Sequence, residues 1–349
     1  MESKRRRKTG NESGQDWTEY FKPDWLALRR EEAIEPDLPI VDPHHHIWEW
    51  LDYGLDAFLA DLTGGHNVRA TVHLESGLAR DPSDPPHLQA VGETRFLMGL
   101  RDDPLLKRPG APDVCAGIVG HVDLDGPEAL CEEALVAHLE AGKAHFKGVR
   151  FNPYSDPVYN WTEGIPPHLS ENPLVRANLE RVAAHGLVCD VMAFHHQLEE
   201  IATMARALPD LTIVMNHCGG FLGRAAKHGD YQAALAEWRK GIEALAREPN
   251  VVMKLGGLGT DFFSGNQLHL EPEPPSSEKI AEIYHPFFVP SIEAFGTKRC
   301  MFESNYPADR QQVDYVILWN GFKRLAAQLS ADEKTDLFSR TAVRVYSLG

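Results

Sequence analysis

The amino-acid sequence predicts an α/β fold, a single (β/α)8 barrel of the TIM-barrel type preceded by an N-terminal extension. Short apolar runs alternate with segments of helical spacing along most of the chain. Parallel strands that are covered on both faces read as continuous apolar runs, and a helix returns the chain to the next strand. Eight such runs fall within about 300 residues, which suits this barrel. Polar side chains gather where the runs end.

The predicted strands and helices follow one another in regular order. The apolar runs occupy residues 39–48, 68–75, 114–122, 147–152, 187–192, 212–216, 251–255 and 299–302. Helical spacing is found at residues 85–101, 126–141, 174–185, 197–208, 231–247 and 277–295. Long connections follow strands at residues 77–85, 153–171 and 260–275, where a barrel builds its pocket. A doubly wound open sheet is the competing layout, but no Gly-x-Gly-x-x-Gly turn follows the first strand.

The composition argues against several classes of protein. The chain has 349 residues, 43% of them hydrophobic, and a formal net charge of -16, which disfavours a nucleic-acid or anionic-membrane partner. No apolar stretch reaches the roughly 18 residues that a membrane span needs. We therefore expect a cytoplasmic protein with a small-molecule substrate, no nucleic acid and no membrane. A homo-oligomeric state is left open.

The first 35 residues differ in character from the rest. They are polar and charged, so we expect a tail and extension over residues 1–35 and the barrel over residues 36–349. The basic run at residues 4–8 is interpreted as part of the solvated tail, with a localisation signal as the alternative. Five scattered cysteines show neither a paired metal spacing nor a disulfide framework, and those inside apolar runs are interpreted as ordinary core.

The first strand ends in a cluster of three histidines. In an extended strand side chains alternate between faces, so Asp42, His44 and His46 are expected on one side, with Pro43 and His45 on the other. Two imidazoles on one face can hold one ion or one anionic group. The carboxyl end of a barrel strand is also where active sites of this architecture lie. The pair His44 and His46 is therefore the first candidate for a functional site.

Other polar residues stand at the ends of the later strands, and a closed barrel would bring them to the same mouth. They are Glu75, His121, Arg150, His195, His217, Lys254 and Asn305, with Asp309 close behind. We expect His217 and His195 to be functional, although His196 could serve in place of His195. For Lys254 the structural interpretation is favoured.

The ordered motifs at these strand ends identify a resemblance. They are Val41-Asp42-Pro43-His44-His45-His46-Ile47-Trp48, Ala70-Thr71-Val72-His73-Leu74-Glu75, Gly148-Val149-Arg150, Phe194-His195-His196-Gln197-Leu198, Asn216-His217-Cys218-Gly219-Gly220, Val252-Met253-Lys254-Leu255-Gly256-Gly257 and Met301-Phe302-Glu303-Ser304-Asn305-Tyr306-Pro307. In this order the chain, from about residue 36 to its end, resembles the amidohydrolase superfamily, in the amidohydrolase-related group that includes sugar-acid and muconate-type lactone hydrolases. The resemblance implies a (β/α)8 barrel. It identifies the substrate much less closely, because one fold hosts many reactions.

Two departures from that resemblance bear on the chemistry. Members of the superfamily commonly have an aspartate at the end of strand eight as metal ligand and proton acceptor, whereas this chain has Asn305. An amide is neutral and cannot accept a proton at neutral pH. Strand four ends in Arg150 rather than in a residue that bridges two ions, so a two-metal centre is not expected.

Two mechanisms for a hydrolase remain open. In the first, His44 and His46, with His195 as a further ligand, bind one divalent metal, for which Zn²⁺ is the leading candidate; it lowers the pKa of a bound water to roughly 7. In the second no metal is present, the imidazoles donate hydrogen bonds to the carbonyl, and Asp309 or His217 activates the water. Asn305 then orients water or substrate.

The expected substrate-binding residues are Arg150, Glu75, Tyr154 and Trp161. Arg150 can anchor a substrate carboxylate through two parallel hydrogen bonds, or can form an ion pair with Glu75 inside the barrel. Tyr154 and Trp161 could cover an apolar or planar substrate, or only pack on the rim. We expect a lactonase-like hydrolase that opens a lactone or related cyclic ester or amide of a small carboxylated substrate. The alternatives are a metal-dependent decarboxylase and a barrel that binds a ligand without turnover.

Overall fold

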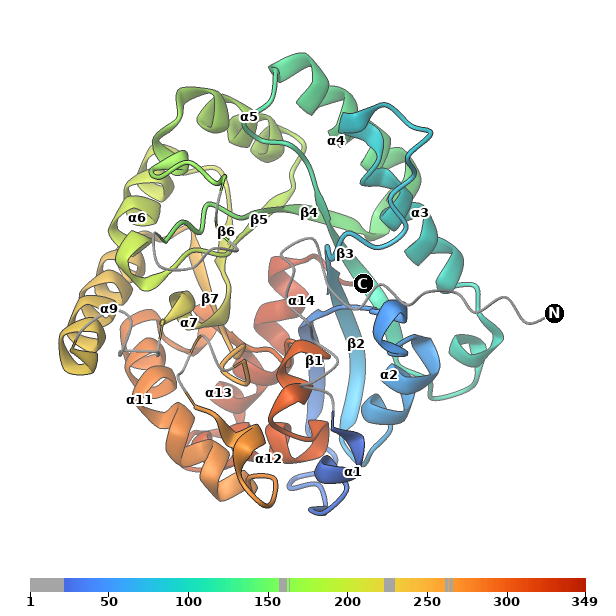
Figure 1. The fold of residues 1–349 in the computed structure, drawn as a ribbon, viewed down its shortest axis with the longest axis vertical. Coiled ribbons are helices and arrows are strands. Elements are labelled where there is room, and N and C mark those ends of the chain that lie inside the picture. The colour runs from blue at the N-terminus through green and yellow to red at the C-terminus, as the bar shows by residue number, and fades with distance from the viewer. Residues whose placement is uncertain (1–21, 157–161, 163, 223–229, 261–262, 264–265) are drawn as a thin grey trace.

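A computed structural model describes residues 22–156, 162, 164–222, 230–260, 263 and 266–349 (Figure 1). Eight parallel strands pair in chain order, β1 with β2 through to β7 with β8. Residues after β8 then pair with the end of β1, since His45 forms a bridge with Tyr306. The strands are β1 (Pro39–His45), β2 (Asn67–Leu74), β3 (Asp113–His121), β4 (Phe146–Phe151), β5 (Val188–Val191), β6 (Ile213–Met215), β7 (Val251–Leu255) and β8 (Cys300–Phe302). The predicted (β/α)8 barrel is confirmed, with all eight strands at the expected places.

Helices surround the strands (Figure 1). They are α1 (Pro23–Leu26), α2 (Leu55–Leu62), α3 (Val91–Leu100), α4 (Glu128–Gly142), α5 (Pro173–Ala184), α6 (Leu198–Ala207), α7 (His217–Gly220), α9 (Tyr231–Ala246), α11 (Ser277–Phe295), α12 (Tyr315–Leu325), α13 (Ala331–Thr335) and α14 (Thr341–Val345). The six segments of helical spacing are confirmed as α3 to α6, α9 and α11. Within the described part of the chain, no helix is long and apolar enough to cross a membrane.

Local sequence fixes where several of these helices begin. The Asn172 side chain accepts a hydrogen bond from the backbone N–H of Leu174, and Pro173 fills the first helical position of α5. Asp230 caps α9 in the same way, and Ser276 caps α11. Such caps satisfy backbone donors that the first turn leaves without partners, each worth about 1 kcal/mol. These three helices therefore begin directly after a polar side chain that caps them.

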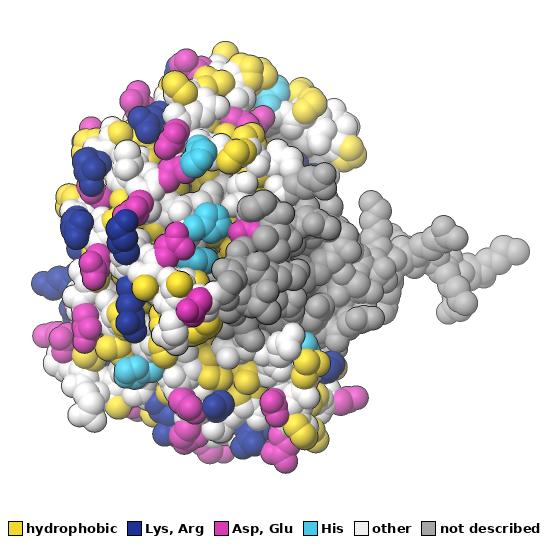
Figure 2. Space-filling view, turned by 60° about the vertical axis from the view of Figure 1, so that its left-hand side comes forward, with side chains coloured by type: hydrophobic (Ala, Val, Ile, Leu, Met, Phe, Trp, Pro, Cys, Tyr) yellow, Lys and Arg dark blue, Asp and Glu magenta, His cyan; other side chains and the backbone are white. Residues whose placement is uncertain are grey.

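The extension ahead of the barrel is described from residue 22 and packs along the segment between β7 and α11. The indole of Trp25 donates to the carbonyl of Glu271, and Arg29 donates to the carbonyl of Pro274. Further on, the backbone N–H of Ile34 donates to the Asn320 side chain in α12. The division of the chain at residue 35 stays a prediction. On the face shown in Figure 2, acidic and basic side chains stand among one another, without a continuous basic patch among the coloured residues.

Two apolar layers form the core. The inner layer joins side chains from seven strands to α14, which fixes its place inside the barrel. Its members are Val41, Val72, Leu74, Val119, Val188, Val214, Val252, Met301, Ala342, Val345 and Tyr346. The outer and larger layer lies between the strands and the surrounding helices. All five cysteines are buried, including those inside apolar runs that the sequence analysis placed in the core.

A buried ion pair crosses the barrel interior. The ammonium of Lys254 lies 2.7 Å from Oδ1 of Asp190, and both side chains are 0% exposed. Asp190 also accepts hydrogen bonds from the Tyr346 hydroxyl and from the Asn216 amide. The interpretation of Lys254 as a structural residue agrees with these contacts. The burial of a charge is tolerated only when it is paired and hydrogen-bonded, which this arrangement provides.

Replacement of Lys254 by methionine should therefore lower the free energy of unfolding by about 3–5 kcal/mol, because it leaves the Asp190 carboxylate buried without its counter-charge. Urea unfolding followed by circular dichroism measures the change. The matched control is Lys240→Met, which removes an exposed ion pair with Glu199 and should leave the stability nearly unchanged, because water screens exposed charges. Equal stability of the two variants would contradict this account of the pair.

Candidate active site

The carboxylate of Glu303 is the centre of the candidate site. Glu303 directly follows β8 and is fully buried. Its Oε1 lies 2.8 Å from Nδ1 of His217 and 2.9 Å from the His217 backbone nitrogen, and its Oε2 lies 2.6 Å from Nδ1 of His44. A single side chain thus connects the carboxyl ends of β1, β6 and β8. Glu303 is not among the site residues predicted from the sequence. Its position immediately after a buried strand is nevertheless the same signal that identified the other strand-end residues.

The protonation of this group follows from its surroundings. Burial works to raise the pKa of Glu303, but the imidazole of His217 and the ammonium of Lys254 outweigh burial and hold that pKa below its usual range. Burial lowers the pKa of His217, although Glu303 opposes the shift. At neutral pH the pair is therefore a carboxylate that accepts a hydrogen bond from a neutral imidazole. The Nδ1 of His217 carries that proton, which leaves a lone pair on its Nε2.

The histidines of β1 lie beside this pair as the sequence predicted. The ring of His44 is 4.6 Å from that of His217 and 5.1 Å from that of His46, measured between centroids. Burial lowers the pKa of both His44 and His46 well below the usual value. The Nδ1 of His46 lies 2.9 Å from the carbonyl of Leu74, so a neutral His46 donates there and keeps the lone pair on Nε2. Three neutral imidazoles are thus brought together at the mouth.

The prediction that Asp42 shares a face with these histidines is wrong. The register of β1 against β2 shifts between Asp42 and His45, which interrupts the alternation of side chains. The Asp42 carboxylate accepts hydrogen bonds from Ser304 and from the Tyr315 hydroxyl of α12. His44 instead reaches Glu303. Asp42 therefore joins the first strand to the end of β8 and to α12.

Arg150 stands at the end of β4 and faces the imidazole of His217. One guanidinium nitrogen is 3.5 Å from Nε2 of His217 and 3.3 Å from the sulfur of Met192. The other terminal nitrogen is 3.9 Å from Oε1 of Glu75, which accepts a shorter hydrogen bond of 3.0 Å from Asn152. The alternative of an ion pair with Glu75 is thus present only as a long contact. Within the described residues, Nε of Arg150 is buried with no hydrogen-bond partner.

Asn305 and Asp309 form a second buried pair beyond β8. The amide nitrogen of Asn305 donates to Oδ1 of Asp309 over 2.8 Å, and the backbone nitrogen of Gly259 donates to Oδ2 over 2.8 Å. Burial raises the pKa of Asp309 well above its usual value, against the effect of these two hydrogen bonds. Asp309 therefore keeps a proton to higher pH than an exposed aspartate. The backbone of Asn305 donates to the carbonyl of His44, which places this pair beside the end of β1.

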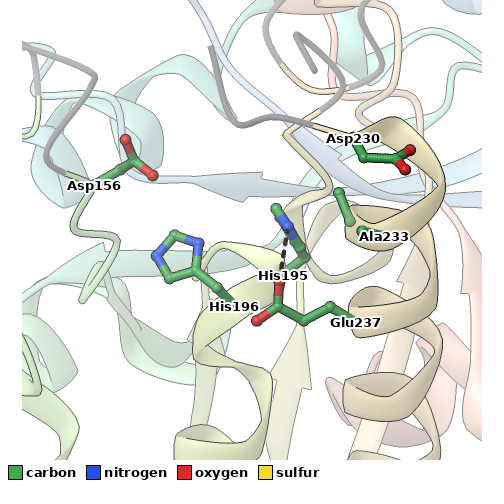
Figure 3. Close-up of a pocket in the computed structure, with 7 residues that line it drawn as sticks. Asp156, His195, His196, Asp230, Ala233 and Glu237 are labelled. Carbon is green, nitrogen blue, oxygen red and sulfur yellow. Dashed lines mark ion pairs between the residues drawn. The ribbon is translucent and has the colours of Figure 1, made fainter. Parts of the chain in front are cut away.

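His195 lies on the wall of a pocket on the α9 side (Figure 3). This pocket has a volume of about 340 Å³ and is lined by Asp156, His195, His196, Asp230, Ala233, Ala234 and Glu237. The Nε2 of His195 is 3.7 Å from Oε2 of Glu237, and His196 contacts the carbonyl of Ser155. His195 thus faces Glu237 of α9, whereas His196 lies on the side of Asp156 and Ser155.

The structure describes only one of the two aromatic residues that were predicted to cover the substrate. Tyr154 packs against Phe194, with ring centroids 5.8 Å apart, and burial raises the pKa of its hydroxyl. Trp161 lies outside the described residues. The role of both in covering a substrate stays a prediction.

The residues around Glu303 fit a divalent metal ion. Ligand atoms of His44, His217 and Glu303 lie within 4.8 Å of one another. The Nε2 of His44 is buried and has no hydrogen-bond partner among the described residues. The carboxylate at Nδ1 of His217 and the carbonyl at Nδ1 of His46 are the kind of partners that fix the tautomer of a metal-binding histidine. Of the two predicted ligands, His44 belongs to this group and His46 lies beside it, with its ring centroid 5.1 Å from that of His44. The role of His44 and His46 as metal ligands stays a prediction.

Comparison with known proteins gives the family to which this barrel belongs. A family model described as Amidohydrolase matches residues 41–348. The uncharacterised protein y4mH of Sinorhizobium fredii is 31% identical over 336 residues, which cover 89% of this chain and 99% of that protein. The chain belongs to the amidohydrolase family.

Two further proteins show how far the similarity extends. The L-fucono-1,5-lactonase of Burkholderia multivorans is 24% identical over 326 residues, with 88% of this chain and 96% of that protein covered. A crystal structure of an amidohydrolase from the same organism, with bound Zn, has a TM-score of 0.66 at 22% identity, covering 89% and 99% of the two chains. The second similarity concerns the fold.

Replacement of Glu303 by glutamine tests the central carboxylate. Glutamine has the same shape but is neutral, so His217 loses the charged acceptor that fixes its tautomer, and His44 loses the carboxylate 2.6 Å from its Nδ1. We expect kcat to fall by about 10²–10⁴-fold on the substrate that the wild-type protein turns over fastest. Glu248→Gln, which alters a buried carboxylate paired with Arg206, is the control and should keep its kcat. An unchanged kcat in Glu303→Gln would exclude the carboxylate from the mechanism.

Proposed function

We propose that this protein is a hydrolase that opens a lactone or related cyclic ester of a small substrate carrying a carboxylate. The observation that carries the proposal is the buried guanidinium of Arg150 beside His217. Arg150 is 8% exposed, and its contact with a carboxylate, that of Glu75, is as long as 3.9 Å. A buried guanidinium is normally satisfied by close acceptors, and a carboxylate offers it two parallel hydrogen bonds. A substrate carboxylate would supply these bonds next to the reacting groups.

The comparisons support the same class of reaction. Family membership makes hydrolysis the first reaction to consider, and a relative of similar length carries the name of a sugar-acid lactonase. At 24% identity that name indicates a class of substrate rather than a particular sugar. A lactone also matches the arrangement at the barrel mouth, where neutral imidazoles surround the position for one polarised carbonyl.

The proposed mechanism uses the pair of His217 and Glu303 as base. Glu303 holds the proton of His217 on Nδ1, so that Nε2 accepts a proton from the attacking water. Water oxygen bonds to the carbonyl carbon, the ring C–O bond breaks, and the proton passes from His217 to the leaving alcohol oxygen. A divalent ion held by His44 and His46 would polarise the carbonyl. Arg150 fixes the carboxylate end of the substrate.

Asp309 is the second candidate for the proton acceptor, as the sequence indicated. Its raised pKa makes it a stronger base when ionised but leaves less of it ionised at neutral pH. Both carboxylate oxygens also accept hydrogen bonds within the protein. These contacts favour a supporting role in which Asp309 positions Asn305, and they favour His217 as the base.

Two substitutions separate these candidates. His217→Asn should lower kcat by about 10²–10⁴-fold, the loss expected when a general base is removed. Asp309→Asn should lower kcat by less than about tenfold if it only positions Asn305. Thermal unfolding of both variants shows whether the fold is retained. A larger loss in Asp309→Asn than in His217→Asn, at equal stability, would move the base to Asp309.

Arg150→Lys tests the carboxylate anchor. Lysine keeps the charge but cannot form the paired hydrogen bonds, so KM for a carboxylated lactone should rise by about tenfold or more, with a smaller change in kcat. A lactone of the same ring without the carboxylate should be nearly indifferent to the substitution. Arg206→Lys, in a surface ion pair with Glu248, is the control.

The assay should record both proton release and carbon dioxide release over a panel of lactones and aromatic acids. Proton release without carbon dioxide supports hydrolysis. Carbon dioxide release would contradict the proposal and identify a decarboxylase.

A further inference from the structure

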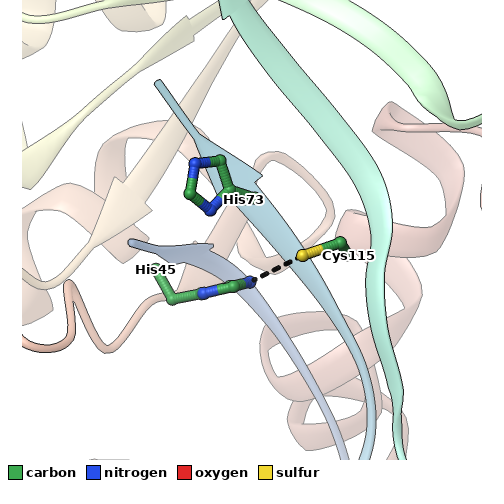
Figure 4. Close-up of side chains that lie close together, drawn as sticks. All are labelled: His45, His73 and Cys115. Carbon is green, nitrogen blue, oxygen red and sulfur yellow. Dashed lines mark hydrogen bonds between the residues drawn. The ribbon is translucent and has the colours of Figure 1, made fainter. Parts of the chain in front are cut away.

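A second group of metal-binding side chains lies on the outer side of β1, away from Glu303. His45, His73 and Cys115 come from β1, β2 and β3, and all three are 0% exposed (Figure 4). His45 and His73 are paired in the register of the two strands, so their side chains share a face. The ring of His45 stacks on Phe58 of α2 at 4.2 Å, which places the group between the strands and the helices.

Cys115 reaches this group through an irregularity of β3. Its φ is +55°, in the left-handed region that non-glycine residues seldom adopt. The register of β3 against β2 shifts between Ala70 and Val72, the stretch opposite Cys115. An irregularity of this kind changes the direction of a side chain. Here it brings the thiol to within 4.0 Å of Nε2 of His45.

The distances suit one metal ion. One ligand atom from each of His45, His73 and Cys115 lies within 4.8 Å of the other two. Around tetrahedral Zn²⁺, with bonds of about 2.3 Å to sulfur and about 2.0–2.1 Å to nitrogen, a sulfur and a nitrogen ligand are about 3.6 Å apart. The observed separation of 4.0 Å between the Cys115 sulfur and His45 Nε2 would need to close by only a few tenths of an ångström.

His73 is held in the form that binds metal. Its Nε2 is 3.0 Å from Oε1 of Glu93, whose carboxylate also accepts from the backbone and hydroxyl of Ser76. A neutral His73 therefore carries its proton on Nε2 and its lone pair on Nδ1. That Nδ1 is buried without a hydrogen-bond partner among the described residues. In Figure 4 a ring nitrogen of His73 points toward the space between His45 and Cys115. A carboxylate behind a histidine in this way is typical of metal sites.

We propose that His45, His73 and Cys115 bind a structural Zn²⁺ ion that joins the first three strands. Sulfur and imidazole ligands select Zn²⁺ over the hard cations. Without an ion, the Thr71 hydroxyl accepts from the backbone nitrogen of Cys115 and is hydrogen-bonded to Nε2 of His45 over 2.9 Å, and the ion would take the place of this second hydrogen bond. The ion displaces the proton of the Cys115 thiol to solvent. The two charges of the ion are then balanced by the thiolate and by Glu93, so the buried group is neutral overall.

Two properties set this group apart from the candidate active site. It is closed to solvent, so the ion would enter while the chain folds. Burial also raises the pKa of the Cys115 thiol to about 12, so without an ion the thiol stays protonated and unreactive. The function that follows is structural: the ion would hold β1 in register, and β1 carries His44 and His46 on its other side.

Cobalt is the probe that tests the proposal, because a thiolate bound to Co²⁺ gives a charge-transfer absorption that imidazole and carboxylate ligands do not give. The full-length protein is produced in minimal medium with Co²⁺, purified, and examined by absorption spectroscopy and metal analysis. We expect the absorption in the wild-type protein and its loss in Cys115→Ser, together with the loss of one equivalent of cobalt. Folded wild-type protein without this absorption would overturn the proposal.

Control variants assign the signal to Cys115. Cys131→Ser alters a buried cysteine of α4, and Cys218→Ser alters the cysteine next to His217; both should keep the absorption. Survival of the absorption in Cys115→Ser, or its loss in Cys218→Ser alone, would overturn the assignment. If Cys115→Ser does not fold, His73→Gln and Glu93→Gln decide. His73→Gln should abolish the absorption, and Glu93→Gln should weaken cobalt binding by about 10–100-fold.

Discussion

The contact of Glu303 with two imidazoles is the interaction on which the mouth of this barrel depends. A carboxylate buried without partners would take up a proton, and histidines buried without partners would lack a fixed tautomer. The carboxylate stays ionised beside both imidazoles, and its hydrogen bond with Nδ1 of His217 fixes the tautomer of that ring. Everything that we propose for catalysis uses the ring nitrogens that this contact leaves available. The site is therefore a property of a group rather than of any histidine alone.

Other charged side chains inside the barrel lie close to that group. The pair of Lys254 and Asp190 neutralises itself and is supported by Tyr346 from the C-terminal helix α14. Above it, Glu303 and the cationic Arg150 lie on either side of His217. A negative substrate entering the mouth thus meets a positive guanidinium, while the lysine beneath is already paired. This arrangement explains why Arg150 can serve as an anchor and why Lys254 belongs to the fold.

The fold was predictable from the sequence because parallel strands have a simple sequence pattern. Each is buried on both faces, so each is an apolar run, and the run at residues 251–255 coincides with β7. The helical spacing at residues 277–295 likewise coincides with α11. Helices α2 and α12 were not predicted. α2 is only 8 residues long and follows the aromatic segment after β1, so its helical spacing has little length in which to show. Side-chain alternation failed at Asp42, where a local shift in register overrides it.

The candidate site was predictable in part. Strand ends identified His44, His46, His217 and Arg150, because a barrel brings strand ends together. Position at a strand end does not tell which way a side chain points, and His195 turns toward Glu237 of α9. Nor does it reveal partners: the link between Asn305 and Asp309, and the role of Glu303, depend on contacts between segments that no local pattern records. The grouping of His45 and His73 with Cys115 of β3 was not predicted for the same reason.

The hydrogen bonds that close the barrel have a consequence for how the site comes into being. The backbone nitrogen of His46 donates to the carbonyl of Tyr306, and that of Asn305 donates to the carbonyl of His44. The first and last strands therefore meet through the very residues that hold the imidazoles and their carboxylate. Because these residues lie near opposite ends of the chain, a nascent or truncated polypeptide has the histidines without the acid that orients them. Activity would therefore appear only when the first and last strands pair. A partly folded chain would not contain a functional part of the site.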